Sequence, residues 1–265
     1  MKKRNVLSAS LLALCLLTLS SFSTANTLEN IQQRKKILIA VDIGAPPYGM
    51  LDGKAKQSGS DIETAQLLAK DLGVELEVVP VSGPNRVPFL LTKKADLVIA
   101  SFSITDARKK VIDFSNPYGV IQVVVGGPVK QKIGTYTDLI GKTVAVTRGT
   151  TSDMELTLGV KEISGVNIVR YEDDATTNTA VSTGQQDYLA AAMSVIPAVK
   201  KANPSRDVET KFIMKTFPLG IGIRKTDAEL KAYLDIWVQI NLKNGKLNEI
   251  YKKYFGVSLP ADMLN

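Results

Sequence analysis

The clearest indication of the fold is the stretch Asp96-Leu-Val-Ile-Ala-Ser-Phe-Ser-Ile-Thr-Asp-Ala-Arg108. It begins as a short apolar run typical of a buried strand, and hydroxyl side chains and an arginine follow directly. Apolar runs and helical patterns alternate on both sides of it, which predicts an α/β fold with helices flanking mixed sheets. Because the carboxyl ends of strands in such sheets face the ligand crevice, Ser101 is expected at a binding site.

The segments around this stretch support the same architecture. Residues 36–41 predict a buried strand, and residues 75–79 predict the next one. Between them, Ser-Asp-Ile-Glu at 60–63 predicts a capping box that starts a helix, which Gly73 ends. A second capping box at 226–229 predicts the start of a long helix near the C-terminus.

The N-terminus has the pattern of an export signal. Lys2, Lys3 and Arg4 form a basic start, and the apolar run at 6–19 is too short to span a bilayer comfortably. Small residues then end at Ala25, so cleavage is predicted after this residue. The alternatives are a membrane anchor or a buried helix.

The only cysteine, Cys15, lies inside the apolar run. It follows Leu14, where a lipidated cysteine would follow a small residue, so lipoprotein anchoring through Cys15 is not expected. The chain after residue 25 has no thiol, which excludes a disulfide framework, a thiolate metal site and a cysteine nucleophile there.

The composition restricts the possible chemistry further. The sequence contains no histidine, which removes Ser-His-Asp and Cys-His catalysis and the commonest zinc ligand. The formal net charge is +7, and without the three basic residues of the leader 30 Lys and Arg stand against 26 Asp and Glu. This mild, scattered excess does not indicate a nucleic-acid partner.

Two polar loops could bind a carboxylate. Arg108 offers a planar fork of donors, and Ser101 and Ser103 add hydroxyls on the same loop. The alternative is a surface ion pair of Arg108 with Asp106 or Asp113.

The second loop, residues 148–152, lies at a predicted strand-to-helix junction, where free N–H groups and the helix dipole favour negative charge. The alternative is an ordinary N-cap. Two such loops on separate α/β units are harder to attribute to structure alone.

The chain after the leader resembles, over essentially its whole length, the family 3 extracellular solute-binding proteins of polar amino-acid ABC transporters. The motifs that carry the resemblance are Gly59-Ser-Asp-Ile-Glu63, Asp96 to Arg108, Asp113-Phe-Ser-Asn-Pro-Tyr118, Asp138-Leu-Ile-Gly-Lys142 and Gly245-Lys-Leu-Asn-Glu-Ile-Tyr251 with Phe255-Gly256. This resemblance implies a two-lobed, type II periplasmic-binding-protein-like fold with the ligand clamped between the lobes.

The domain organisation follows from this resemblance and from two extended, glycine-ended segments. Lobe 1 is expected to comprise residues 26–119 and 221–265, and lobe 2 residues 120–220. The hinge crossings are expected near residues 118–126 and 217–222.

The resemblance also implies the ligand contacts. Arg108 would hold the α-carboxylate, Ser101 and Ser103 would contact the amino acid from the first lobe, and Thr150 and Thr151 would contact its carboxylate from the second. Another three residues would face the ligand side chain. These are Asp42, Asn85 and Arg86, the last two in an Asn-Arg-Val-Pro element similar to that of glutamate and aspartate binders.

Three positions depart from the family pattern. Ala192 stands where a carboxylate usually accepts the α-ammonium group, and Ala45 and Gly83 stand where aromatic rings usually sandwich the ligand. A pairing of Arg86 with Asp42 would favour a neutral polar ligand, whereas Arg86 alone in the pocket would favour an acidic one. The missing carboxylate at Ala192 favours the acidic ligand.

The expected function is therefore that of a periplasmic binding protein, acting as a monomer, that delivers an amino acid to an ABC permease. This function needs no cofactor, metal or covalent chemistry. One alternative is a cyclohexadienyl dehydratase-like enzyme on the same fold, for which Asp42 or Asp173 would be the acid. A ligand-sensing module of a receptor is another.

Overall fold

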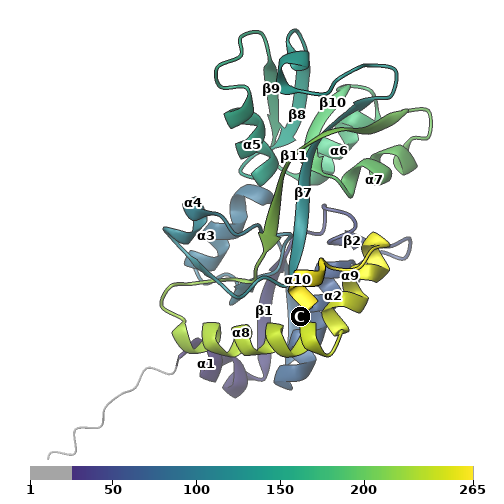
Figure 1. Cartoon of the computed structure of the whole chain (residues 1–265). Coiled ribbons are helices and arrows are strands. Elements are labelled where there is room, and N and C mark those ends of the chain that lie inside the picture. The colour runs from purple at the N-terminus through teal and green to yellow at the C-terminus, as the bar shows by residue number, and fades with distance from the viewer. Residues whose placement is uncertain (1–25, 265) are drawn as a thin grey trace, which may run out of the picture.

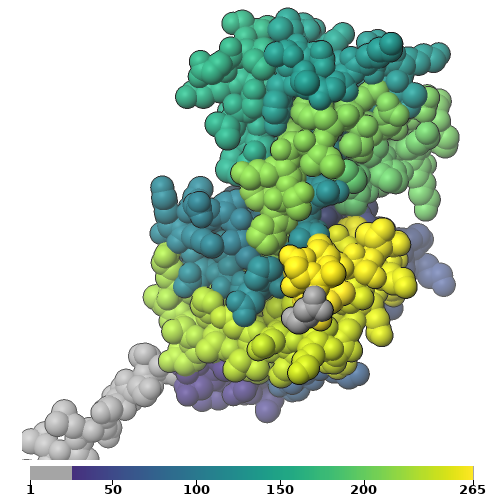
Figure 2. Space-filling model, viewed as in Figure 1, coloured from purple at the N-terminus to yellow at the C-terminus, as the bar shows by residue number. Residues whose placement is uncertain are grey.

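The computed structural model describes residues 26–264, so the predicted signal peptide and Cys15 lie outside the described residues. The chain forms two lobes, stacked one above the other in Figure 1, and each is built on a five-stranded sheet with helices packed on it. Figure 2 shows the surface narrowing where the lobes meet. This arrangement confirms the predicted α/β, two-lobed fold class. Within residues 26–264, no helix has the length and apolarity that a membrane crossing requires.

The first lobe contains the sheet with strand order β4-β1-β5-β12-β6. Its strands are β1 (Lys36–Val41), β4 (Glu75–Pro80), β5 (Leu97–Val98), β6 (Asp113–Phe114) and β12 (Gly222–Ile223). β1 runs parallel to β4 and β5, whereas β12 is antiparallel to β5 and β6. The lobe also has a short hairpin of β2 (Met50–Leu51) and β3 (Gln57–Ser58), and the following helices: α1 (Thr27–Arg34), α2 (Ser60–Leu72), η1 (Gly83–Asn85), α3 (Arg86–Leu91), α4 (Asp106–Lys109), α8 (Ala228–Lys243), α9 (Lys246–Phe255) and α10 (Ala261–Leu264).

The second lobe contains the sheet with strand order β11-β7-β10-β8-β9. Its strands are β7 (Gly119–Pro128), β8 (Thr143–Thr147), β9 (Asn167–Tyr171), β10 (Tyr188–Ala192) and β11 (Val208–Leu219). Its helices are η2 (Tyr136–Leu139), α5 (Thr151–Gly159), α6 (Asp174–Ser182) and α7 (Val195–Ala202). Parallel pairing of β8 with β9 and β10 brings the carboxyl ends of these strands, and the starts of α5 and α6, to one edge of the sheet.

The chain passes between the sheets over residues 115–118 and 220–221. The segment at 118–126, expected as a hinge crossing, is largely the long strand β7, because its backbone pairs with β11 along its whole length. The second crossing is tightly packed, since a Cβ atom on Gly220 would come within 2.8 Å of the Ile104 side chain.

Apolar side chains on one face of α8 are buried in the core. Trp237, Leu230 and Leu234 of α8 pack with β1 and α2 in the first lobe. The Trp237 indole N–H donates to Asp71 on α2 at 2.8 Å, so the one polar atom of this ring has a partner. Trp237 is therefore a core residue of the first lobe.

Both predicted capping boxes are wrong. α2 begins one residue earlier than predicted, and its N-cap is Gly59, with φ 129°. Only glycine fits there, because a Cβ atom would lie 2.2 Å from the Tyr48 carbonyl oxygen. The Glu63 carboxylate accepts a hydrogen bond from the Tyr254 hydroxyl at 2.6 Å instead of closing the box. At α8 the N-cap is Asp227, which makes no side-chain cap bond and pairs with Arg224.

Candidate ligand-binding site

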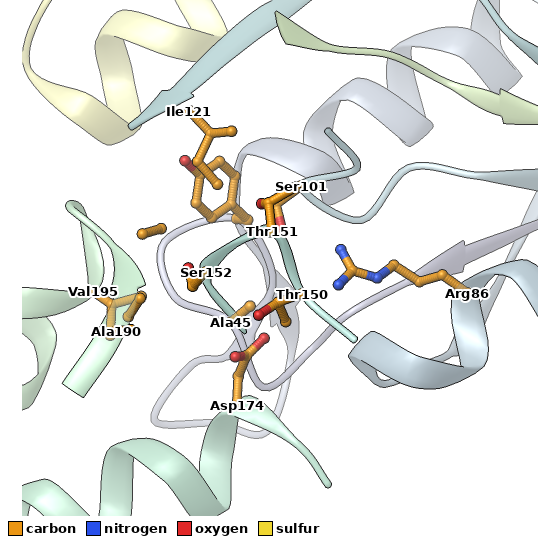
Figure 3. Close-up of a pocket in the computed structure, with 13 residues that line it drawn as sticks. Ala45, Arg86, Ser101, Ile121, Thr150, Thr151, Ser152, Asp174, Ala190 and Val195 are labelled. Carbon is orange, nitrogen blue, oxygen red and sulfur yellow. The ribbon is translucent and has the colours of Figure 1, made fainter. Parts of the chain in front are cut away.

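A small cavity lies between the two lobes and has walls from both (Figure 3). Its polar side carries Arg86 and Ser101 from the first lobe and Thr150, Thr151, Ser152 and Asp174 from the second. The rest of the wall consists of the Tyr48 ring and of aliphatic side chains, namely Ala45, Ile121, Val195 and the three alanines at 190–192. The cavity volume of about 30 Å³ has room for one or two water molecules, so an amino acid can enter only if the lobes separate.

Arg86 reaches this cavity from the first turn of α3 and is almost fully buried. Its guanidinium donates to the Gly83 carbonyl at 3.1 Å and to the Ala100 carbonyl at 2.9 Å. Its Cζ atom also lies 5.3 Å from the centroid of the Phe102 ring. These contacts fix the guanidinium and leave its remaining N–H groups directed toward the threonines of the second lobe.

Ser101 lies on the cavity wall in a left-handed backbone conformation, with φ 44°. Its N–H donates to the Asp61 carboxylate at 2.6 Å, and the Tyr118 hydroxyl donates to the same carboxylate at 3.0 Å. Burial raises the pKa of Asp61 to about 6. Sequence reasoning used Asp61 only as part of a motif, because its role depends on partners far away in the chain.

In the second lobe, Thr150 and Thr151 stand at the start of α5. The Thr150 hydroxyl accepts from the Asp153 N–H at 3.1 Å and donates to the Thr147 carbonyl at 2.8 Å, so Thr150 is an N-cap as well as a cavity residue. The Thr151 hydroxyl lies 3.0 Å from that of Ser103, which is fully buried. This bond joins the two lobes directly behind the cavity.

Arg108 is held outside the cavity. Its guanidinium donates to the Ser103 carbonyl at 2.8 Å and, across the lobes, to the Gly149 carbonyl at 3.2 Å. Its Cζ atom is 4.6 Å from the Phe102 ring centroid, so Phe102 lies close to both this arginine and Arg86. Burial, together with the Arg86 charge, lowers the pKa of Arg108 to about 9.

The charges of Arg86 and Arg108 are unusual for this protein. Within residues 26–264 neither has a carboxylate at ion-pair distance, and Arg108 pairs with neither of the aspartates proposed for it. The remaining arginines of that range all form ion pairs, namely Arg34, Arg148, Arg170, Arg206 and Arg224. Two shielded guanidinium groups in one region favour an anionic group as a third partner.

Asp42 and Asp174 face each other across the lobe boundary. Asp42 directly follows β1 and is 4% exposed, and its Oδ1 accepts from the Gly44 N–H at 3.1 Å. Asp174 is the first residue of α6, lies on the cavity wall and accepts from the Thr147 hydroxyl at 2.5 Å. Burial and the Asp174 charge raise the pKa of Asp42 to about 7, and burial also raises the pKa of Asp174.

Sequence reasoning missed Asp174 and named its neighbour Asp173. The Asp173 carboxylate accepts from the Thr176 N–H at 2.7 Å and is the N-cap of α6. The available signal was the position of Asp174 one residue further on, at the start of a helix after a strand that neighbours β8.

The remaining predicted positions divide into two groups. Asn85 is exposed and donates to the Ser82 hydroxyl at 2.9 Å, so it does not reach the cavity. Ala45 and Ala192 line the cavity, and a Cβ atom on Gly83 would lie 3.0 Å from the Arg148 carbonyl of the other lobe. The three positions that depart from the family pattern thus lie at or beside the cavity.

A cavity with walls from two α/β lobes, which the chain joins by two crossings, defines a two-lobed solute-binding protein. The chain belongs to the bacterial extracellular solute-binding proteins, family 3, whose family model matches residues 37–257. This finding confirms the family resemblance of the sequence motifs.

Named relatives agree with this assignment. The chain is 31% identical over 247 residues to the L-cystine-binding protein TcyJ of Escherichia coli (strain K12), covering 92% of this chain and 91% of the relative. It is similar to the solved structure of the P235GK mutant of ArgBP from T. maritima, with 30% identity and a TM-score of 0.79 over 87% of this chain and 100% of that chain. A second similar structure is the ancestral amino acid-binding protein AncCDT-1, a precursor of cyclohexadienyl dehydratase, with 31% identity and a TM-score of 0.77 over 86% of this chain and 99% of that chain.

Proposed function

We propose that this protein binds an amino acid between its two lobes in the periplasm and delivers it to an ABC permease. The observation that carries the proposal is the cavity at the lobe boundary, where both lobes supply polar groups and Arg86 has no ion-pair partner among residues 26–264. A carboxylate on a small ligand fits this charge, and the hydroxyls of Ser101 and Thr151 fit its oxygens and its amine.

The mechanism follows from contacts that exist only when the lobes are together. A ligand that touches both walls stabilises the closed form, so binding shifts the population from open to closed. The bond between Ser103 and Thr151 and the bond from Arg108 to Gly149 stabilise the same closed form. Rotation about the predicted crossings near 118–126 and 217–222 would open the cavity.

The proposed ligand is a zwitterionic amino acid, in place of the acidic ligand that the sequence favoured. That prediction counted the carboxylate missing at Ala192 but did not include Asp174, which returns a negative charge to the second lobe. With Asp42 and Asp174 close to Arg86, the region has no positive surplus that a second ligand carboxylate would require.

Thermal unfolding with the twenty amino acids, L-cystine and common dicarboxylates tests this proposal. A ligand at a hundred times its dissociation constant should add about 2.7 kcal/mol to the free energy of unfolding, which raises the melting temperature measurably. Stabilisation by dicarboxylates alone, with no amino acid active, would contradict the proposed ligand class.

The second candidate is a dehydratase, favoured by the similarity to AncCDT-1 and by the raised pKa of Asp42, which suits a general acid. Asp173 no longer serves as an acid, because its carboxylate caps α6. Incubation with a cyclohexadienyl substrate, followed by detection of the aromatic product, distinguishes the candidates. Ligand retention without turnover supports the binding protein.

Export with cleavage after Ala25 belongs to the same proposal. Asn26 would then be the first residue, and its side chain already caps α1 by accepting from the Glu29 N–H at 3.0 Å. The intact mass of the exported protein should correspond to a chain that begins at Asn26. A full-length chain recovered from the cytoplasm of the native host would contradict it.

A further inference from the structure

The carboxyl pair of Asp42 and Asp174 brings together acids from opposite lobes. The loop that follows Asp42 packs on the start of α6, since a Cβ atom on Gly44 would lie 3.3 Å from the Ala175 Cβ. Asp42 is 4% exposed, and its Oδ2 atom has no hydrogen-bond partner in the described part of the chain. Asp174 lies on the cavity wall itself. A buried acceptor without a donor, beside a second carboxyl, indicates a missing donor.

The surrounding groups do not supply that donor. Arg86 is the cation whose charge acts on both carboxyls, but its guanidinium donates to the Gly83 and Ala100 carbonyls. Asp61 adds a negative charge near Asp42, and Asp173 adds one near Asp174. The Thr147 hydroxyl and the Gly44 N–H each reach one oxygen. The pair therefore has acceptor capacity and negative potential that remain unused.

At Ala192, by contrast, the cavity lacks an acceptor. This methyl group lines the wall at the end of β10, where the family pattern led us to expect the carboxylate that accepts the ligand amine. An amino acid bound with its carboxylate toward Arg86 needs another acceptor for its ammonium group, because a buried ammonium without partners is costly.

We propose that Asp42 and Asp174 together accept the ammonium group of the bound amino acid, and that the ligand displaces the proton which this pair shares before binding. The inference rests on the proposed function. Before binding, one of the two facing carboxyls carries the proton that neutralises part of the pair's charge. The ligand arrives as an ammonium ion, the shared proton passes to the buffer, and both carboxylates then accept N–H groups.

This exchange makes binding depend on pH with a defined sign. Both pKa values are raised by burial and by the neighbouring charges, that of Asp42 to about 7. Below pH 7 the pair must lose a proton before the ligand binds, so affinity rises as pH rises and levels off above pH 7. Displacement of one proton corresponds to roughly a tenfold gain in affinity per pH unit on the acidic side.

Titration calorimetry with the exported protein tests this inference, using L-cystine, L-arginine and L-glutamine as probes and succinate as the probe without an amine. Each probe is titrated at pH 6 and pH 8 in two buffers of different ionisation heat, which counts the protons released. We expect release of close to one proton at pH 6 and little at pH 8 for each amino acid that binds, and no binding of succinate.

The Asp174→Asn variant should lose the proton release and the pH dependence, and at pH 8 its affinity should fall by roughly thirtyfold or more. Asn keeps the size of the side chain and can still accept from Thr147, and thermal unfolding checks that the variant folds. Asp42→Asn should behave in the same way. The matched control is Asp173→Asn, which keeps the α6 cap and should retain wild-type affinity.

The inference would be overturned if Asp174→Asn kept wild-type affinity and wild-type proton release. The pair would then be only a structural contact between the lobes. Tight binding of the amino acids by wild type without any proton release would also overturn it, while leaving the proposed function intact. If neither these probes nor any other amino acid of the thermal-unfolding screen binds to wild type, the proposed function is wrong and this inference with it.

Discussion

At the residue scale, the two arginines beside Phe102 have different roles. Arg86 lies on the cavity wall, whereas Arg108 lies outside it and connects the lobes through the Gly149 carbonyl. The sequence motif predicted Arg108 as the carboxylate anchor, and that assignment stays a prediction. Because its other bond is to the Ser103 carbonyl, Arg108 also supports the loop that carries Ser101.

Replacement of Arg108 by Ala should weaken amino-acid binding by about 2 to 5 kcal/mol. The ligand carboxylate would lose a cationic partner if Arg108 binds it, and otherwise the closed form would lose the bond to the Gly149 carbonyl. Lys should restore little of this loss, since a point charge cannot reproduce two-pronged donation. Calorimetry on both variants measures the effect. Arg170→Ala is the control, because Arg170 is paired with Asp153 and should not affect affinity. Unchanged affinity in Arg108→Ala would show that this guanidinium is dispensable for the ligand.

At the element scale, the start of α2 connects the ligand loop to the hinge. One carboxylate, Asp61, accepts from the backbone N–H of Ser101 and from the hydroxyl of Tyr118, which directly precedes β7. Ser101 needs this support, because a serine in the left-handed region is strained unless its surroundings hold it. The element therefore fixes a cavity residue and a crossing between the lobes at the same time.

Asp61→Ala should lower ligand affinity as well as stability, because the Ser101 backbone loses the acceptor that holds its conformation. Tyr118→Phe removes only the hydroxyl, and should cost about 1 kcal/mol of stability with little change in affinity. Asp71→Ala is a control on the same helix, since Asp71 accepts from Trp237 away from the cavity and should lower stability alone. Urea unfolding and calorimetry separate the two effects, and equal affinity in Asp61→Ala and Asp71→Ala would contradict the positioning role.

At the scale of the whole molecule, two hydrogen bonds between the lobes stabilise the closed form. The hydroxyls of Ser103 and Thr151 meet at 3.0 Å, and the Arg108 guanidinium reaches Gly149. Each such bond contributes about 1 kcal/mol at most, so closure by these contacts alone is readily reversed. We expect a ligand that adds bonds to both walls to make the closed form dominant.

A double variant, Ser103→Cys with Thr151→Cys, should form a disulfide in the closed form, because the two side chains lie within bridging reach. The chain after residue 25 has no other cysteine. Ligand should accelerate oxidation several-fold by favouring closure, and mass spectrometry with thiol labelling measures the rate. Either single variant should remain unbridged within the chain. Calorimetry first checks that the reduced double variant still binds the ligand, and a rate that then does not respond to ligand would contradict closure on binding.

Several strands and the positions of three cavity residues could be predicted from the amino-acid sequence. Local patterns predict buried strands at 96–100 and 142–147, and the residues after them must then lie at the carboxyl edge of a sheet. This rule brings Ser101, Thr150 and Thr151 to the cavity, because each directly follows or opens an element. The absence of a carboxylate at Ala192 was likewise evident from the sequence.

The contacts among the charged side chains of the site depend on the tertiary structure. Asp174 meets Asp42 across the lobe boundary although 132 positions separate them in the chain, and no local pattern encodes that contact. The same holds for Gly59 as the cap of α2, which the nearby Tyr48 carbonyl imposes. Periodicity reports which face of an element is buried, whereas the pKa of a carboxyl depends on every group that packs around it, and those groups come together only when the chain has folded.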